Sequence, residues 1–215
     1  MPPARSVVIG LTGGIATGKS RVAHLLRSLG AAVECSDRIV RELQAPGGLA
    51  LRRIAETFGE HYVTSRGELD RERLGDLVFR TPKAREKLNR IVHPLVFQEL
   101  TARLQHHLEA RQPVIVLDIP LLVEGRMAGQ GSGAGLPFDQ IVLVYAPEEL
   151  QLERLVARDG LTLEEAQRRV ASQLSIEEKR KYADVVIENG GDWESTEARV
   201  RALYQGWLEH PPHPI

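Results

Sequence analysis

The sequence predicts an α/β protein built on a doubly wound sheet of five parallel strands, and two observations support this fold class. Short apolar runs alternate along the chain with longer stretches in which apolar residues recur at helical spacing. The short runs are almost unbroken by polar residues, as expected for strands that helices cover on both faces. A chain of 215 residues, 42% of them hydrophobic, is also long enough to bury such a core.

The strand candidates are short and mostly apolar. They are VVIGL at 7–11, AAVEC at 31–35, VIVLD at 114–118, QIVLVY at 140–145 and DVVIE at 184–188. The chain contains no internal repeat, so these strands are expected to form a single sheet.

The long segment between the second and third strands carries almost no strand signal. Its apolar residues recur three and four positions apart, as in amphipathic helices. They are Leu88, Ile91, Val92, Leu95, Val96, Leu100, Leu104 and Leu108. We therefore expect residues 45–112 to form a helical insert in a core made of residues 1–44 and 113–215.

The second half of the chain contains a glycine-rich segment and several helices. Residues 125–137 predict a flexible surface loop. Helices that follow Thr162 and Ser175 are each expected to open with a capping box, because a glutamate lies three residues later in both. A last helix should pack on the core through an apolar stripe formed by Val200, Leu203, Tyr204, Trp207 and Leu208.

The charge balance limits the classes of partner. The chain has 28 Lys and Arg against 29 Asp and Glu, so nothing global favours nucleic acid or a membrane surface. One cysteine excludes an internal disulfide, and no apolar run is long enough to span a membrane. The first residues run directly into a strand and not into a signal sequence. We expect a cytoplasmic protein that is a monomer or a small homo-oligomer.

The most informative motif lies between the first strand and the following helix. Residues 13–20, GGIATGKS, fit the spacing G-x-x-x-x-G-K-[ST] of a nucleotide-binding P-loop. The context fits too, since a strand precedes the motif and Val22, Leu25, Leu26 and Leu29 follow at helical spacing.

The chemistry of a phosphate chain explains these residue types. Glycines let successive backbone N–H groups point inward as an anion nest, and the following helix adds its unpaired N–H groups and positive end. Lys19 then neutralises the β- and γ-phosphates, and the Ser20 hydroxyl can bind Mg²⁺. The sequence therefore predicts a P-loop NTPase-type nucleotide site.

Other residues select among the P-loop enzymes. Asp118 ends a buried apolar strand, where an acid near Mg²⁺ and its waters is expected; the alternative is a strand-end cap or a salt-bridge partner. The chain has no N-K-x-D run for guanine and no modules of a motor or transporter. A small-molecule kinase is the simplest interpretation.

Such a kinase needs a base for the acceptor hydroxyl. Asp37 follows the second strand, and carboxyl ends of strands border the active crevice in doubly wound sheets. The equally weighted alternative is that Ser36 or Asp37 caps the next helix.

A lid that excludes water is expected at about 147–182. Gln151, Arg154 and Arg158 recur at i, i+3 and i+7, which predicts a polar face opposite Leu152, Leu155 and Val156. Arg169 and Gln173 form a second pair. Arginines placed in this way can bind phosphates bidentately, although arginines on helices are more often simply solvated.

These residues resemble the dephospho-coenzyme A kinase family over nearly the whole chain. The resemblance rests on GLTGGIATGKS, the Ser36–Asp37 pair, LNRIVHPLV at 88–96, VLDIPLLVE at 116–124, the lid sequence at 151–173 and KYADVVIENGG at 181–191. It implies phosphorylation of the ribose 3′-hydroxyl of dephospho-CoA by ATP with Mg²⁺. It also implies a nucleotide-binding core, a CoA-binding insert and a mobile lid.

The resemblance assigns roles to individual positions. Lys19, Asp37 and Arg154 would be catalytic, and Ser20 with Asp118 would hold the metal. ATP would contact Gly14, Ile15, Ala16, Thr17, Gly18, Lys19, Ser20, Arg21, Arg158, Asn189 and Gly191. The acceptor would contact Asp37, His93, Leu121 and Glu124, although from the residues alone His93 predicts a helix break before Pro94.

Three positions depart from the family pattern. Cys35 replaces the first acid of a D-A-D motif, Ala16 replaces a loop glycine, and Arg21 replaces a frequent threonine. Ala16 raises the question whether this backbone position needs a positive φ. The alternatives that remain are another nucleoside or nucleotide kinase and a non-catalytic nucleotide sensor.

Overall fold

The computed structural model describes residues 5–131 and 133–212, and it divides the chain into two compact units. The first contains the chain up to Glu34 and from Arg103 onward, and the second contains Cys35–Ala102. The expected insert was 45–112. The difference arises because helix α2 (Ser36–Leu43) packs with helices of the second unit, whereas the end of helix α5 (Pro82–Glu109) belongs to the first.

The first unit is built on a five-stranded sheet with the order β2-β3-β1-β4-β5, which confirms the predicted fold class. β1 pairs in parallel with β3 and β4, and β4 pairs in parallel with β5. The strands are β1 (Val7–Gly13), β2 (Ala32–Cys35), β3 (Val114–Asp118), β4 (Gln140–Tyr145) and β5 (Val185–Glu188). β1 extends two residues beyond the predicted run, so it leads directly into the P-loop.

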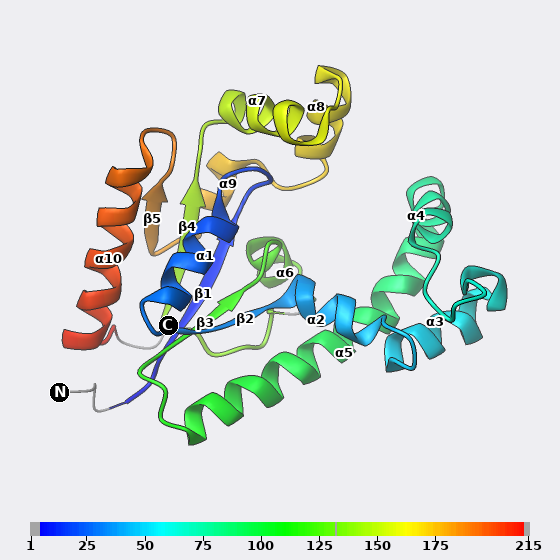
Figure 1. Ribbon diagram of the computed structural model, residues 1–215, viewed down its shortest axis with the longest axis horizontal. Helices are drawn as coiled ribbons and strands as arrows, with labels where there is room; N and C mark the ends of the chain where they lie inside the picture. The colour runs from blue at the N-terminus through cyan, green and yellow to red at the C-terminus, as the bar shows by residue number, and fades with distance from the viewer. Residues whose placement is uncertain (1–4, 132, 213–215) are drawn as a thin grey trace. The chain divides into compact units, whose positions relative to one another are not determined.

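Successive side chains of each strand point to opposite sides of the sheet, and the central strands are buried on both sides. On one face, Val7, Ile9 and Leu11 join a cluster that includes residues of helices α1 (Lys19–Ser28) and α10 (Trp193–Glu209). α1 and α10 lie side by side against the sheet (Figure 1). On the other face, Gly10 approaches Leu122 and Phe138 so closely that a Cβ atom would collide with them.

The C-terminal stripe packs as predicted. Val200 and Trp207 are buried in the core cluster, and Leu203, Tyr204 and Leu208 pack against it. The Trp207 indole also donates a hydrogen bond to Gln140 Oε1 at 2.9 Å.

Four shorter helices complete the first unit. They are α6 (Leu122–Met127), α7 (Glu148–Asp159), α8 (Leu163–Ala171) and α9 (Ile176–Arg180). Thr162 and Glu165 form the complete predicted capping box at α8. At α9, Ser175 accepts a hydrogen bond from the Glu178 amide, while the Glu178 carboxylate pairs with Lys181.

The second unit is helical, as the spacing of its apolar residues predicts. It holds α2, α3 (Leu49–Phe58), the short 3₁₀ helix η1 (Glu60–Tyr62), α4 (Arg71–Arg80) and most of α5.

One sequence expectation is wrong and another is only partly correct. α5 continues through Pro94, so His93 does not mark a helix break; Pro94 is exposed, where water can satisfy the carbonyl that the ring leaves unpaired. Residues 125–137 are not simply a surface loop, since their start belongs to α6 and Leu136 is 4% exposed. Gly133 of this segment is buried against Leu122, where a side chain would not fit. Residue 132 lies outside the described residues.

None of the helices in the described ranges combines the length and the apolar character that crossing a membrane requires.

Candidate active site

The turn between β1 and α1 has the backbone of an anion-binding loop. Gly18 occupies the N-cap of α1 with φ 87°, and among the described residues no side chain caps this helix. In its first turn the Arg21 N–H donates to the Gly18 carbonyl at 2.9 Å, while the N–H groups of Lys19 and Ser20 have no acceptor among the described residues and are left for a ligand at the positive end of the helix dipole. Within the turn, the Thr17 hydroxyl donates to the Gly14 carbonyl at 3.0 Å and holds the loop closed.

Ala16 answers the question raised by its departure from the family pattern. It has φ 57°, so the position does need a left-handed conformation, which alanine adopts at a cost that glycine avoids. At Gly18 the constraint is stricter, because a Cβ atom there would collide with the Asn189 side-chain amide.

Asn189 is a brace of the P-loop. Its side-chain amide donates to the Thr17 carbonyl at 2.7 Å and its Oδ1 accepts from the Thr196 hydroxyl at 3.1 Å. The residue is 6% exposed, and its backbone N–H donates to the Tyr145 carbonyl at 2.8 Å. The Asn189 side chain is thus hydrogen-bonded within the protein through both its nitrogen and its oxygen. Only the main chain of residues 189–191 is left to face a nucleotide base. Gly191 is exposed and has no atom within contact distance of a Cβ built on it.

Lys19 and Asp118 lie together, so Asp118 is a salt-bridge partner in this structure, which is one of the alternatives to the metal role expected of it. Their side chains form an ion pair in which the ammonium is 11% and the carboxylate 5% exposed. Asp118 ends β3 and Lys19 begins α1, so both are held by elements that pack in the core. A phosphate chain that enters the loop would compete with Asp118 for the ammonium.

The donor set suits Mg²⁺. Magnesium prefers oxygen ligands and takes only one or two from the protein, with water and substrate phosphates supplying the others. The exposed Ser20 hydroxyl and the Asp118 carboxylate provide two such oxygens. In the described ranges there is no group of three or more His, Cys, Asp and Glu arranged for a metal, so the phosphates would have to complete the coordination.

The predicted polar face of α7 is only partly correct. Gln151 is buried on the same side as Leu155, because residues four apart share a face of a helix. Its amide donates to the Ala146 carbonyl at 2.8 Å, and its Oε1 lies against Gly14. Arg154, half-buried, donates to the Asn189 carbonyl at 2.9 Å. The first turns of α7 therefore adjoin the P-loop.

The other lid arginines are tied to a carboxylate. Arg158 from α7 and Arg169 from α8 both pair with Asp159, at 2.7 and 3.0 Å. The hydrogen bond from Arg158 lowers the pKa of Asp159 below its usual range. Both arginines are exposed and could exchange this partner for phosphate. Gln173, in contrast, has a buried Oε1 with no hydrogen-bond partner among the described residues.

Arg21 lies over the side-chain ring of Trp193, the first residue of the helix that follows the 189–191 loop. Its guanidinium is 3.7 Å from the centroid of the Trp193 ring, a cation–π contact between α1 and α10. The arginine that stands here in place of the frequent threonine therefore has a contact of its own, with Trp193.

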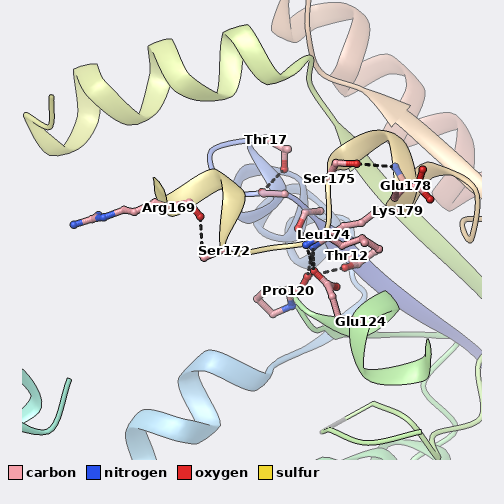
Figure 2. Close-up of polar contacts among 12 residues, drawn as sticks. Thr12, Thr17, Pro120, Glu124, Arg169, Ser172, Leu174, Ser175, Glu178 and Lys179 are labelled. Atoms are coloured by element: carbon pink, nitrogen blue, oxygen red, sulfur yellow. Dashed lines mark hydrogen bonds and ion pairs between the residues drawn. The ribbon is translucent and has the colours of Figure 1, made fainter. Parts of the chain in front are cut away.

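A buried lysine that the sequence analysis did not single out lies beneath the loop. Lys179 in α9 is fully buried, and its ammonium pairs with Glu124 Oε1 at 2.9 Å (Figure 2). Burial lowers the pKa of Lys179, which the contact with Glu124 partly opposes. Lys179 shares a helix face with the buried Ile176, but this spacing alone does not predict a buried lysine. Leu121, predicted to contact the acceptor, is 50% exposed beside this region.

Asp37 and His93 belong to the second unit. α2 starts at Ser36 with Cys35 in the N-cap position, so neither Ser36 nor Asp37 is the cap. Asp37 is an exposed carboxylate in the first turn, where the helix dipole stabilises its charge. His93 is half-buried in α5, and burial lowers its pKa below 6.5.

Comparison with known proteins gives a consistent result. A sequence model described as dephospho-CoA kinase matches residues 7–195. A dephospho-CoA kinase of Carboxydothermus hydrogenoformans is 42% identical over 200 residues, which covers 93% of this chain and 94% of that protein. One from Enterococcus faecalis is 43% identical over 202 residues, covering 94% and 96%. A crystal structure from Thermus thermophilus matches with a TM-score of 0.74 and 35% identity, covering 94% of this chain and 97% of that one.

Proposed function

This chain belongs to the dephospho-CoA kinase family, a family of kinases, and we propose that it transfers the γ-phosphoryl group of ATP to the ribose 3′-hydroxyl of dephospho-CoA, giving coenzyme A. The observation that carries the proposal is the P-loop, an uncapped helix N-terminus followed directly by Lys19. Phosphoryl transfer of this kind depends mainly on positioning and on electrostatic stabilisation.

At the donor end, the main-chain N–H groups of residues 14–21 and the positive end of α1 hold the phosphates. Lys19 exchanges Asp118 for the β- and γ-phosphate oxygens. The main chain at Asn189 and Gly191 lies against the adenine, and Arg21 borders the same region. The braced Thr17 carbonyl supports this arrangement, because it keeps the loop in shape before ATP binds.

Ser20 and Asp118 are the residues that hold Mg²⁺. When bound, the ion neutralises charge that develops on the phosphates. Before ATP binds, the ion pair with Lys19 holds the Asp118 carboxylate beside the loop.

At the acceptor end, Asp37 accepts the proton of the 3′-hydroxyl as it attacks. Its carboxylate is exposed in the first turn of α2 and is therefore accessible to an acceptor hydroxyl. His93, Leu121 and Glu124 contact dephospho-CoA. His93 is neutral at pH 7 and can accept or donate one hydrogen bond.

Arg154 and Arg158 close over the phosphates and exclude water. Arg154 is the better supported of the two, because it already lies beside the loop through the Asn189 carbonyl. The segment 147–182 acts as the lid, residues 45–112 as the CoA-binding insert, and the rest as the nucleotide-binding core. The reaction takes place in the cytoplasm, and the enzyme acts as a monomer or small homo-oligomer on a small molecule, without nucleic acid or membrane.

The test is a panel of acceptors supplied with ATP and Mg²⁺. Dephospho-CoA, adenosine, nucleoside monophosphates and shikimate are compared, and the phosphorylated product is identified by mass. We expect a single phosphorylation of dephospho-CoA at least about 10³-fold faster than of the others, since an unpaired site group rejects a wrong acceptor strongly. Preferred transfer to another acceptor would replace the proposal, and tight ATP binding without any transfer would favour a nucleotide sensor.

Two variants separate the donor and acceptor roles. Lys19→Ala should lower kcat/KM by about 10³-fold or more, because it removes a charge from the transferring phosphates. Asp37→Asn should keep the affinity for ATP, measured by calorimetry, and lose transfer. An Asp37→Asn enzyme with a near-normal rate would eliminate Asp37 as the base.

A further inference from the structure

Lys179 stands out because its ammonium is fully buried yet has an acceptor for each of its three protons. It contacts the carboxylate of Glu124 at 2.9 Å, the carbonyl of Pro120 at 3.1 Å and the carbonyl of Gly13 at 3.3 Å. A charged group is retained at such a place only when it is paired and hydrogen-bonded, as here.

The three acceptors come from different parts of the phosphate-binding region. Gly13 is the last residue of β1 before the P-loop turn, Pro120 follows β3, and Glu124 lies in α6. The Thr12 hydroxyl donates to the same Pro120 carbonyl at 3.0 Å. One ammonium from α9 thus joins the start of the P-loop to the segment that carries Asp118.

Glu124 extends this connection to the returning end of the lid. The same oxygen that pairs with Lys179 accepts the backbone N–H of Leu174 at 3.2 Å, between α8 and α9. Figure 2 shows Leu174, Lys179, Pro120 and Thr12 gathered around the Glu124 carboxylate. The second oxygen, Oε2, is buried without a hydrogen-bond partner among the described residues. A buried oxygen without a hydrogen bond lowers the stability of the fold. The contacts of Oε1 must therefore hold the Glu124 side chain in this position.

The lid and the P-loop are therefore linked through Leu174, Glu124, Lys179 and Gly13. The start of the lid is also tied, through Gln151 and Arg154 of α7, whereas α8 between the two attachments is anchored mainly by the surface pairs around Asp159. A lid segment that closes over a nucleotide turns about hinge residues. If the ends of the segment are firmly attached to the core, the segment closes along one path.

We propose that Lys179 and Glu124 are positioning residues that fix the returning end of the lid to the base of the P-loop. Lid movement is then confined to the segment between the first turns of α7 and Leu174. Closure over the phosphates stays aligned with Lys19, so the γ-phosphoryl group reaches the acceptor and not water. This role rests on the proposed phosphoryl transfer and adds two residues that need not touch the reacting atoms.

The first experiment follows the Leu174 amide directly and needs no acceptor. Hydrogen exchange of a peptide that covers residues 170–178 is measured in the wild type, Lys179→Met and Glu124→Gln. We expect exchange at Leu174 to rise about tenfold or more in Lys179→Met, since the carboxylate loses the partner that orients it. In the matched control, Lys181→Met, exchange should not change, because Lys181 pairs with Glu178 on the exposed side of the same helix end.

The second experiment measures how ATP is divided between acceptor and water. In both variants, hydrolysis relative to transfer should rise about tenfold while KM for ATP changes by less than threefold. The double variant Lys179→Met/Glu124→Gln should be no worse than the worse single variant, because the two side chains act as one unit. Lys181→Met should keep the wild-type ratio.

The outcomes are distinct. An unchanged ratio and unchanged Leu174 exchange overturn the proposal, and so does a fall of both rates in parallel, which marks a merely structural role. If Lys179→Met does not fold, Leu174 exchange in Glu124→Gln decides, because this variant keeps the size of the side chain and exchange needs no acceptor. A wild type that never phosphorylates dephospho-CoA refutes the proposed function alone, since exchange and ATP hydrolysis are still measurable.

Discussion

Two lysines of the same chemistry occupy different situations around the P-loop. Lys19 is partly exposed and has one carboxylate partner, which an incoming phosphate can replace. Lys179 is fully buried and has all its protons bonded within the protein. The first is suited to bind a ligand and the second to hold main-chain segments in position. Exposure and partner type, and not residue type, separate the two roles.

His93 provides a pH-dependent test at the level of one side chain. Burial lowers its pKa below 6.5, so in the window between the lowered value and 6.5 the unfolded chain binds more protons than the folded chain. The free energy of unfolding should therefore fall as pH decreases through this window and level off below it.

The measurement compares urea unfolding of the wild type and His93→Gln between about pH 5 and 8, a range that brackets the ordinary histidine pKa. The difference between the two proteins should change in the acidic part of the range only. Parallel curves throughout would show that His93 titrates normally.

Among the elements, α1 and α8 begin in opposite ways. α1 starts at a glycine without a side-chain cap, which leaves the N–H groups of Lys19 and Ser20 without an acceptor among the described residues. α8 starts with a complete capping box, in which Thr162 Oγ1 accepts from the Glu165 amide at 3.3 Å and Glu165 accepts from the Thr162 amide at 2.9 Å. A helix on the exposed lid has few buried contacts, so its cap carries more of its stability.

Thr162→Ala should weaken α8 by about 1 kcal/mol, the usual contribution of an N-cap. Because α8 buries little beyond Ala166, we expect faster hydrogen exchange at residues 163–171 with little change in the global unfolding midpoint. Asp192→Ala removes the cap of α10, which packs in the core, and should lower the global midpoint instead. Equal effects of both variants on the midpoint would contradict this distinction.

At the level of the whole molecule, the first unit depends on the layer that covers the α1 and α10 face of its sheet. Trp207 is 3% exposed and connects α10 to β4 through Gln140. Removing a buried aromatic ring leaves a cavity and an unpaired amide, which together cost several kcal/mol.

Trp207→Ala should therefore destabilise the first unit by roughly 3–5 kcal/mol, measured by denaturant unfolding followed by circular dichroism. The control is Phe79→Ala, since Phe79 is 86% exposed in the second unit and should change stability by less than about 0.5 kcal/mol. A similar loss in both variants would show that Trp207 is not part of the core that limits stability.

Much of the fold could be predicted because its signals are local. The runs 114–118 and 140–145 became strands with the predicted bounds, since an unbroken apolar run between helices has only one buried arrangement in a parallel sheet. The P-loop could be predicted for the same reason: glycine freedom, Lys19 and the helix start are adjacent in sequence. The assignments of Asp37 and His93 to the acceptor remain predictions.

The errors share a different cause. Gln151 was placed on a polar face, and the whole of 125–137 was expected to lie at the surface although Gly133 and Leu136 are buried, because polarity and glycine content suggest solvent. In both cases the burial depends on acceptors or apolar surfaces supplied from distant positions, such as the Ala146 carbonyl for Gln151 and Leu122 for Gly133.

The sequence by itself determined the order of strands and helices, the phosphate-binding loop and the family. Only the tertiary structure decided that Lys179, and neither of the cations at 180 and 181, is buried, and that Glu124 pairs with it. The physical reason is that a buried charge is stable only where several acceptors converge. Gly13, Pro120 and Glu124 are far from Lys179 in sequence, so no local pattern encodes their meeting.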